Sequence, residues 1–202
     1  MKVFVIVDMQ NDFITGPLGN KRAVAAADNI LTFLKQNNNS NNIVLFTKDT
    51  HQENYLDTQE GQWLPIKHCI EGTPGWSIYK PISEFVDKES NFSHYSQKGI
   101  IKGRILKSTF GSFDLAKVLQ QIKTQLAARG EKLEEVVFMG VCTDICVISN
   151  VLITKAALPE TMISILKDGC AATSDIRQYS AFDIMHSCQV YPTPVTTLGN
   201  LY

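Results

Sequence analysis

The sequence predicts an α/β fold: an open, doubly wound sheet of six mostly parallel strands. Two observations support this fold class. Short apolar runs alternate with segments of helical periodicity, which is the pattern of βαβ units. These runs are apolar almost throughout, as expected for strands that are covered on both faces. The 202-residue chain, which is 44% hydrophobic and 19% charged, has the size and composition of one globular domain. We therefore expect a single domain over residues 1–202.

The expected elements can be placed in chain order. A buried strand over residues 3–7 precedes a helix over 23–35, where apolar side chains recur every three to four residues. A second strand over 42–48 leads into a long polar segment, residues 49–76, which we interpret as an inserted loop with a functional role. Beyond it, strands are expected at 100–106, 136–141, 162–166 and 190–195. Helices are expected between them at 113–128, 146–157 and 176–186.

Charge and cysteine content limit the partners. Nineteen basic and twenty acidic side chains give a formal charge of −1, so no basic excess favours binding to nucleic acid or to an anionic membrane surface. No apolar run is long enough to span a membrane, and the opening residues do not read as a signal peptide. An odd number of cysteines in a chain of this size indicates reduced thiols and a cytoplasmic protein: Cys69, Cys142, Cys146, Cys170 and Cys188.

Reactive side chains fall at the ends of four predicted strands. Asp8 follows the first strand, Asp49 and His51 follow the second, Lys107 follows the third, and Cys146 lies on the turn after the fourth. In open α/β sheets, ligands bind at the carboxyl ends of the strands. We therefore expect these side chains to meet in one crevice, where a small molecule would bind.

Three of these residues suggest nucleophilic catalysis. Cys146 precedes a predicted helix, whose N-terminus would favour a thiolate, although a free cysteine is also often a buried structural residue. Asp8 would be costly at the end of an apolar strand unless it is paired; it could equally cap a helix. Lys107 could supply its pair, and the two could then act as an acid–base couple beside the thiol.

The segment after the second strand suggests a metal site. Asp49 and His51 lie two residues apart, so in extended chain their side chains point the same way. Glu60 and His68 follow in the loop. Imidazole and carboxylate ligands suit Zn²⁺, Mn²⁺ or Fe²⁺. A surface turn with one exposed histidine is the structural alternative.

The sequence resembles the isochorismatase-like cysteine hydrolases and, within them, the nicotinamidases. The resemblance runs nearly end to end and rests on five ordered motifs: VIVDMQNDFITGPLG (5–19), TKDTH (47–51), KHCIEGTPGW (67–76), LKSTFGSFDL (106–115) and MGVCTDICV (139–147). The first, fourth and fifth motifs mark the superfamily. The Asp-x-His pair with the later H-C-x-x-G-T-P-G segment marks nicotinamidase.

The resemblance implies a fold, an activity and a set of site residues. It implies an isochorismatase-like sheet and hydrolysis of nicotinamide to nicotinate and ammonia through a thioester on cysteine. The implied catalytic triad is Asp8, Lys107 and Cys146. The implied metal ligands are Asp49, His51 and His68, with Glu60 as a fourth, and the cofactor is a divalent ion, Zn²⁺ with Mn²⁺ or Fe²⁺ as alternatives.

Further features come with the same resemblance. A cis peptide is expected between Val141 and Cys142, so that the backbone N–H groups of Cys142 and Cys146 form an oxyanion hole. Phe13 and Trp63 are the candidates for aromatic walls around the substrate ring. Relatives often form dimers or tetramers, which implies a homo-oligomer.

The chain also departs from the family pattern. Phe110 stands where many relatives have tyrosine, and Cys142 where many have alanine or valine. Lys102 is an alternative to Lys107, which we prefer for its three-residue spacing to Phe110. The segment before His68 is about one residue longer than usual, so Leu64 is an alternative to Trp63.

Three other functions remain open. The protein could be another amide or carbamoyl hydrolase of the superfamily, which would keep the triad and generally lack the metal ligands. It could be a non-catalytic or isochorismate-type binding module, although retention of Cys146 argues against this. A nucleotide-binding Rossmann protein is disfavoured because no G-x-G-x-x-G follows the first strand.

Overall fold

A computed structural model describes residues 1–93, 95–96, 100 and 102–193. Its core is a six-stranded sheet in the order β3-β2-β1-β4-β5-β6, and all five strand pairings are parallel. This confirms the doubly wound fold and makes the described sheet entirely parallel. The strands are β1 (Lys2–Val7), β2 (Asn42–Asp49), β3 (Arg104–Lys107), β4 (Glu135–Val141), β5 (Met162–Ala171) and β6 (Val190–Pro192).

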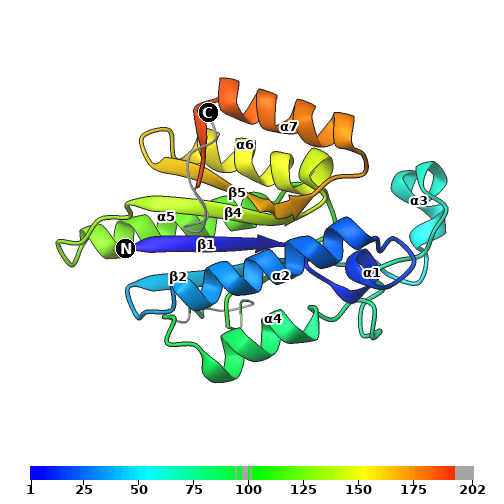
Figure 1. The fold of residues 1–202 in the computed structure, drawn as a ribbon, viewed down its shortest axis with the longest axis horizontal. Coiled ribbons are helices and arrows are strands. Elements are labelled where there is room, and N and C mark those ends of the chain that lie inside the picture. The colour runs from blue at the N-terminus through cyan, green and yellow to red at the C-terminus, as the bar shows by residue number, and fades with distance from the viewer. Residues whose placement is uncertain (94, 97–99, 101, 194–202) are drawn as a thin grey trace.

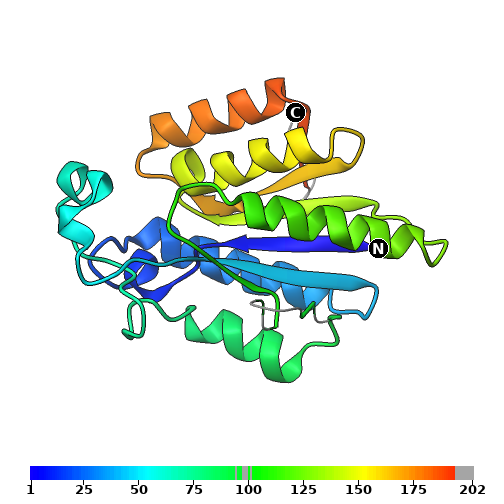
Figure 2. The ribbon, with the colours of Figure 1, turned by 180° about the vertical axis from the view of Figure 1, so that it is seen from behind.

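Helices cover both faces of the sheet (Figures 1 and 2). Side chains that alternate along β1 enter two separate apolar clusters, because successive residues of a strand point to opposite faces. The cluster that includes Phe4 packs beneath α2 and α4, and the cluster that includes Val5 packs beneath α5, α6 and α7. The helices are α1 (Asn11–Ile14), α2 (Lys21–Gln36), α3 (Gln59–Trp63), α4 (Lys80–Glu84), α5 (Phe113–Ala127), α6 (Ile148–Ala157) and α7 (Asp175–Ser187).

Several expected boundaries were wrong. The third strand begins at Arg104 rather than at residue 100, because Lys102 and Gly103 adopt positive φ angles of 49° and 71° in a turn. The fifth strand continues beyond residue 166 to Ala171. The helix expected from residue 146 begins at Ile148, after a π-helical turn over Thr143–Val147. Residues 194–195 of the last expected strand lie outside the described residues.

The strand order reverses between β1 and β4, and the backbone is specialised there. Gly140 of β4 pairs with Val7 of β1 and has a φ of 130°; a Cβ at this position would collide with the Val7 carbonyl oxygen. Only glycine adopts such a conformation readily. Asp8 follows with a φ of 50°, which turns the chain away at the end of β1. Asp8 therefore lies at the switch point of the sheet, where α/β proteins bind their ligands.

The first part of the segment between β2 and β3 lies at the same end of the sheet. It carries α3, which lies beyond the carboxyl ends of the strands in Figure 1. The long polar segment is thus not featureless, since it contains a 3₁₀ turn at Tyr55–Asp57 and the short α3.

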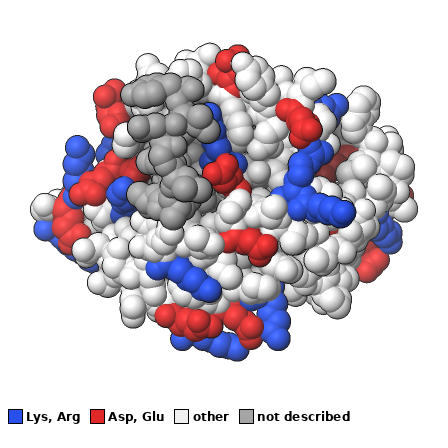
Figure 3. All heavy atoms as spheres, viewed as in Figure 1, with Lys and Arg blue, Asp and Glu red and all other residues white. Residues whose placement is uncertain are grey.

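The surface carries mixed charge. On the face shown in Figure 3, acidic and basic side chains are interspersed, in keeping with the formal charge of −1. Within the described part of the chain, none of the helices has the length and apolar character that crossing a membrane requires.

Candidate active site

Four of the predicted residues meet at the carboxyl edge of the sheet. Asp8 follows β1, Asp49 ends β2, Lys107 ends β3, and Cys146 lies in the turn between β4 and α6. All four are buried: the most exposed, Cys146, is 7% exposed. The topology thus brings together side chains that are far apart in the sequence.

Lys107 is the centre of this group. Its Nζ forms ion pairs with Asp8 Oδ2 at 2.6 Å and with Asp49 Oδ1 at 3.2 Å, and it lies 3.6 Å from Cys146 Sγ. One ammonium therefore contacts both carboxylates and the thiol. Lys102, the alternative lysine, is exposed and precedes β3.

Burial and neighbouring charges act in opposite directions on these groups, and the net effect raises the pKa of each. Burial raises the pKa of the Cys146 thiol well above its ordinary value, although the Lys107 ammonium opposes the rise. Burial likewise raises the pKa of Asp8, again opposed by Lys107. Burial lowers the pKa of Lys107, but the negative charges of Asp8, Cys146 and Asp49 together outweigh it and raise that pKa well above the usual range. The resting site thus holds a neutral thiol beside a lysine that stays charged.

Thr47 supports the other oxygen of Asp8. Its hydroxyl donates to Asp8 Oδ1 at 2.6 Å, and its side chain is fully buried in β2. A short hydrogen bond to a carboxylate favours the ionised form. Asp8 therefore receives a positive charge on one oxygen and a hydroxyl donor on the other.

A second cluster lies next to the first. Its ligand atoms all lie within 4.8 Å of one another: one each from Asp49, His51, Glu60 and His68. His51 Nε2 lies 2.8 Å from Asp49 Oδ2 and 3.7 Å from Glu60 Oε1. His68 Nε2 lies 3.5 Å and 3.8 Å from the same two oxygens.

These residues fit a divalent cation. Bonds of about 2.0–2.1 Å in a tetrahedral site place ligand atoms about 3.4 Å apart, which falls within the observed separations. His68 Nδ1 donates to the Ile66 carbonyl oxygen at 2.8 Å. That bond fixes the tautomer and leaves Nε2 free to coordinate, as is usual for histidine ligands. Burial raises the pKa of Asp49, but the two imidazoles and the Lys107 ammonium together outweigh it and hold the pKa well below its usual range, so the Asp49 carboxylate is ionised.

Asp49 connects the two clusters. Its Oδ1 contacts Lys107, while its Oδ2 faces the two imidazoles. Gln10 holds the backbone of Asp49 in place, because the Gln10 side chain accepts from the Asp49 N–H at 2.7 Å and donates to the Asp49 carbonyl at 2.8 Å. The thiol cluster and the candidate metal site are therefore parts of one site.

The two expected ring walls differ in position. The Phe13 ring is buried and packs edge-on against the His68 ring, with centroids 5.3 Å apart. Trp63 ends α3 and is 92% exposed, so its ring is not packed against the cluster. Its alternative, Leu64, is half-buried, and its carbonyl accepts from the Tyr55 hydroxyl at 3.0 Å.

The cis peptide bond lies between Val141 and Cys142, where it was expected. The Cys142 carbonyl oxygen accepts from the backbone N–H groups of Ile145 and Val147, each at 3.1 Å. These bonds close the turn that carries Cys146 above the end of β4. The Cys142 side chain packs with the α2-side cluster, whereas Cys146 belongs to the other cluster.

Sequence reasoning missed several supporting residues. Gln10 and Thr47 each lie within a quoted motif, but only the structure shows that they hold Asp49 and Asp8. The Tyr55 ring packs tilted against the His51 ring and edge-on against the His68 ring, with centroids 4.7 Å and 5.0 Å apart. A polar side chain within an apolar strand was the available signal for Thr47. The buried Asn150 of α6 gave no such signal, because polar residues are common on amphipathic helices.

The fold and the site together define a class: α/β proteins with a parallel sheet and a buried thiol at its switch point, next to a lysine and two carboxylates. The chain belongs to the isochorismatase family, since the Isochorismatase domain matches residues 2–197. No curated protein matches the sequence.

Solved structures with this fold include enzymes with different substrates. Nicotinamidase from Bacillus subtilis is 22% identical with a TM-score of 0.70, and the similarity covers 96% of this chain and 99% of that one. A pyrazinamidase from Pyrococcus horikoshii in complex with zinc is 20% identical (TM-score 0.67, coverage 95% and 98%). N-carbamoylsarcosine amidase from Thermoplasma acidophilum is 18% identical (TM-score 0.64, coverage 98% and 99%). At these identities the similarity establishes the shared fold.

Proposed function

We propose that the protein is a metal-assisted cysteine amidohydrolase that converts nicotinamide to nicotinate and ammonia. The observation that carries this proposal is the contact of Asp49 with both clusters, through Lys107 on one oxygen and the two imidazoles on the other. A thiol that attacks an amide and a cation that binds the ring of the same substrate must lie close together. The structural similarity to nicotinamidases and pyrazinamidases supports the same assignment.

The candidate cation site accounts for ring recognition. A divalent ion held by Asp49, His51, Glu60 and His68 would bind the pyridine nitrogen and withdraw electrons from the attached carboxamide. Phe13, which packs against His68, would contact the bound ring. Zinc is the expected ion, because two imidazoles and two carboxylates suit it and a relative was solved with zinc.

Asp8, Lys107 and Cys146 would perform the covalent chemistry. Asp8 takes the proton of the Cys146 thiol, and the sulfur attacks the carboxamide carbon. The N–H groups of Cys142 and Cys146 stabilise the oxyanion. The C–N bond then breaks and Asp8 returns the proton to the departing ammonia, leaving a thioester. Water, deprotonated by Asp8, hydrolyses the thioester, which releases nicotinate and restores the thiol.

The raised pKa values fit this sequence of steps. Burial raises the pKa of Asp8 as well as that of the thiol, so the Asp8 carboxylate is a stronger base for the thiol proton than an ordinary aspartate. Lys107 stays protonated throughout and stabilises whichever partner is negative. Its role is electrostatic rather than as an acid or base.

An ammonia-release assay on a panel of small amides tests the proposal. The panel contains nicotinamide, pyrazinamide and benzamide, which keeps the ring but lacks the ring nitrogen, together with N-carbamoylsarcosine. The proposal expects turnover of nicotinamide and pyrazinamide, and little of benzamide. Turnover of N-carbamoylsarcosine without turnover of nicotinamide would instead assign the protein to the carbamoyl hydrolases of the same fold.

A further inference from the structure

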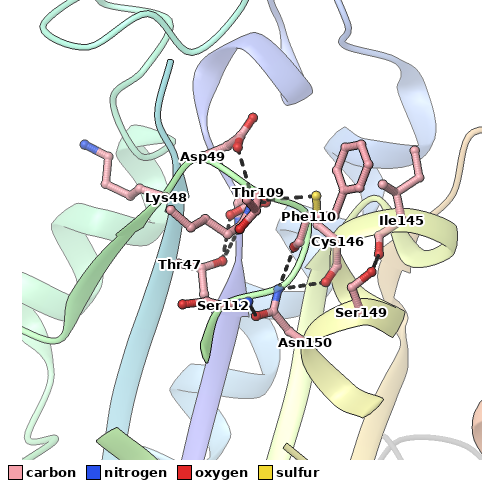
Figure 4. Close-up of polar contacts among 12 residues, drawn as sticks. Thr47, Lys48, Asp49, Thr109, Phe110, Ser112, Ile145, Cys146, Ser149 and Asn150 are labelled. Carbon is pink, nitrogen blue, oxygen red and sulfur yellow. Dashed lines mark hydrogen bonds and ion pairs between the residues drawn. The ribbon is translucent and has the colours of Figure 1, made fainter. Parts of the chain in front are cut away.

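Asn150 is a fully buried amide in the first turn of α6, and it makes three hydrogen bonds. Its Nδ2 donates to the Cys146 carbonyl at 2.8 Å and to the Phe110 carbonyl at 3.1 Å. Its Oδ1 accepts from the Ser112 backbone N–H at 2.9 Å. Figure 4 shows these contacts. Because a backbone N–H can only donate and a carbonyl can only accept, the three partners fix the orientation of the amide.

The partners belong to two different segments. Cys146 lies on the turn before α6, whereas Phe110 and Ser112 lie on the loop that follows Lys107 and leads into α5. Asn150 thus joins the segment that carries the thiol to the segment that carries the lysine. Each bond is to backbone, so the amide positions the chain itself rather than one rotatable side chain.

Gly111 provides independent evidence of this close approach. A Cβ at Gly111 would lie 2.5 Å from Ile153 Cδ1 and 3.2 Å from Ser149 Cβ, both on α6. The loop therefore packs directly against α6, and a larger residue would push it away. Asn150 bonds to the residues on either side of this contact point.

We propose that Asn150 is a positioning residue that holds the Cys146 sulfur at working distance from the Lys107 ammonium. The proposal rests on the proposed function only for its effect on turnover. It states that the 3.6 Å separation between Lys107 Nζ and Cys146 Sγ depends on the three hydrogen bonds of Asn150, which join the two segments. We call this connection the joint. An error of about 1 Å in such a site can reduce the rate about 100-fold.

Three variants distinguish the loss of this joint from the loss of a hydrogen bond within α6. Asn150→Ala removes all three bonds. Asn150→Thr keeps a local bond, because a threonine hydroxyl can donate to the carbonyl four residues earlier, that of Cys146, but it cannot span to the loop. Ser149→Ala is the matched control: the Ser149 hydroxyl donates to the Ile145 carbonyl at 2.7 Å, the same type of bond in the same turn, and this bond does not reach the loop.

The kinetic readout is kcat per folded enzyme, with KM measured alongside. We expect Asn150→Ala and Asn150→Thr to lose roughly 10- to 100-fold in kcat with KM little changed, while Ser149→Ala stays near wild type. Recovery of wild-type kcat by Asn150→Thr would overturn the proposal, because the local helix bond would then suffice. The proposal would also be overturned if the activity lost in Asn150→Ala were fully explained by a smaller fraction of folded protein.

A second readout does not require turnover. The pH midpoint of Cys146 carbamidomethylation by iodoacetamide, with the site identified by mass spectrometry, reports the electrostatic environment of the sulfur. Burial raises the pKa of this thiol most, Lys107 lowers it, and Asp8, Asp49 and Cys142 raise it further; moving the sulfur away from the ammonium weakens the one influence that lowers it. We expect it to rise in both Asn150 variants and not in Ser149→Ala. An unchanged midpoint would overturn the proposal even if nicotinamide is not the substrate.

The loop can also be displaced with Asn150 intact, in case its variants do not fold. Gly111→Ala should push the loop from α6 and produce the same rise in midpoint. Adding Ile153→Ala removes the colliding methyl group and should restore the wild-type midpoint. If Gly111→Ala leaves the midpoint unchanged, the separation of sulfur and ammonium does not depend on this joint.

Discussion

The hydrogen bond from Thr47 to Asp8 can be removed with little change of shape. Thr47→Val deletes the hydroxyl that donates to Asp8 Oδ1 at 2.6 Å in a fully buried position. A hydrogen bond to a charged group contributes roughly 1.5–3 kcal/mol. At 1.36 kcal/mol per pH unit, losing it should raise the pKa of Asp8 by about 1–2 units, because the bond stabilises only the ionised carboxylate.

The direction of the effect on rate follows from the role of Asp8. The carboxylate must be ionised to accept the thiol proton, so kcat/KM falls as the pH drops through the pKa of Asp8. Burial already raises that pKa. The fall of kcat/KM on the acid side of its pH profile, the acid limb, therefore lies at higher pH than an ordinary aspartate would give. Thr47→Val should move the limb further toward neutral pH, and the loss of rate should be largest in acid and smallest on the plateau.

The assay is the pH profile of kcat/KM for ammonia release from nicotinamide. Thr154→Val is the control, because Thr154 is also fully buried but its hydroxyl has no hydrogen-bond partner among the described residues. The acid limb of this variant should coincide with that of wild type. If Thr47→Val lowers the rate equally at every pH and leaves the limb in place, Asp8 is not the group that titrates, and the reasoning fails.

The remaining predictions concern charge, metal and stability. Lys107→Ala should reduce kcat/KM about 10²–10³-fold, as loss of a buried charge-stabilising donor does, whereas Lys102→Ala should stay near wild type; the reverse ranking would move the lysine role to Lys102. Chelation should abolish nicotinamide hydrolysis, and added Zn²⁺ should restore it. Both His51→Ala and His68→Ala should bind less metal, as measured by elemental analysis. Unchanged kinetics in metal-free protein would remove the ion from the mechanism. Asn20→Ala should cost about 1 kcal/mol in urea unfolding, because the Asn20 side chain caps α2 by accepting from two backbone N–H groups, and an unchanged midpoint would contradict that account.

The sequence was sufficient to predict the fold because the evidence for it is local. Apolar runs and helical periodicity depend only on neighbouring residues, and the connection rules for parallel sheets limit the possible topologies. The errors fell where local pattern competes with backbone geometry. Lys102 is compatible with an extended strand by residue type, yet its positive φ shortens β3.

The candidate site could be predicted only in part. Side chains at strand ends, such as Asp8 and Lys107, are placed by topology, so their convergence could be expected. Trp63 depends instead on the conformation of a long loop, for which the sequence has no comparable rule. Supporting residues such as Gln10 and Asn150 act through backbone groups distant in the chain, and no spacing within the sequence indicates such partners.

The most direct measurement is a search for the acyl-enzyme. Nicotinamide is mixed with the protein, the reaction is quenched in acid, and the digest is analysed by mass spectrometry. Our account predicts a nicotinoyl group on the peptide that contains Cys146, absent from Cys146→Ala, which should also release no ammonia. Ammonia release by Cys146→Ala at a rate near that of wild type would contradict it.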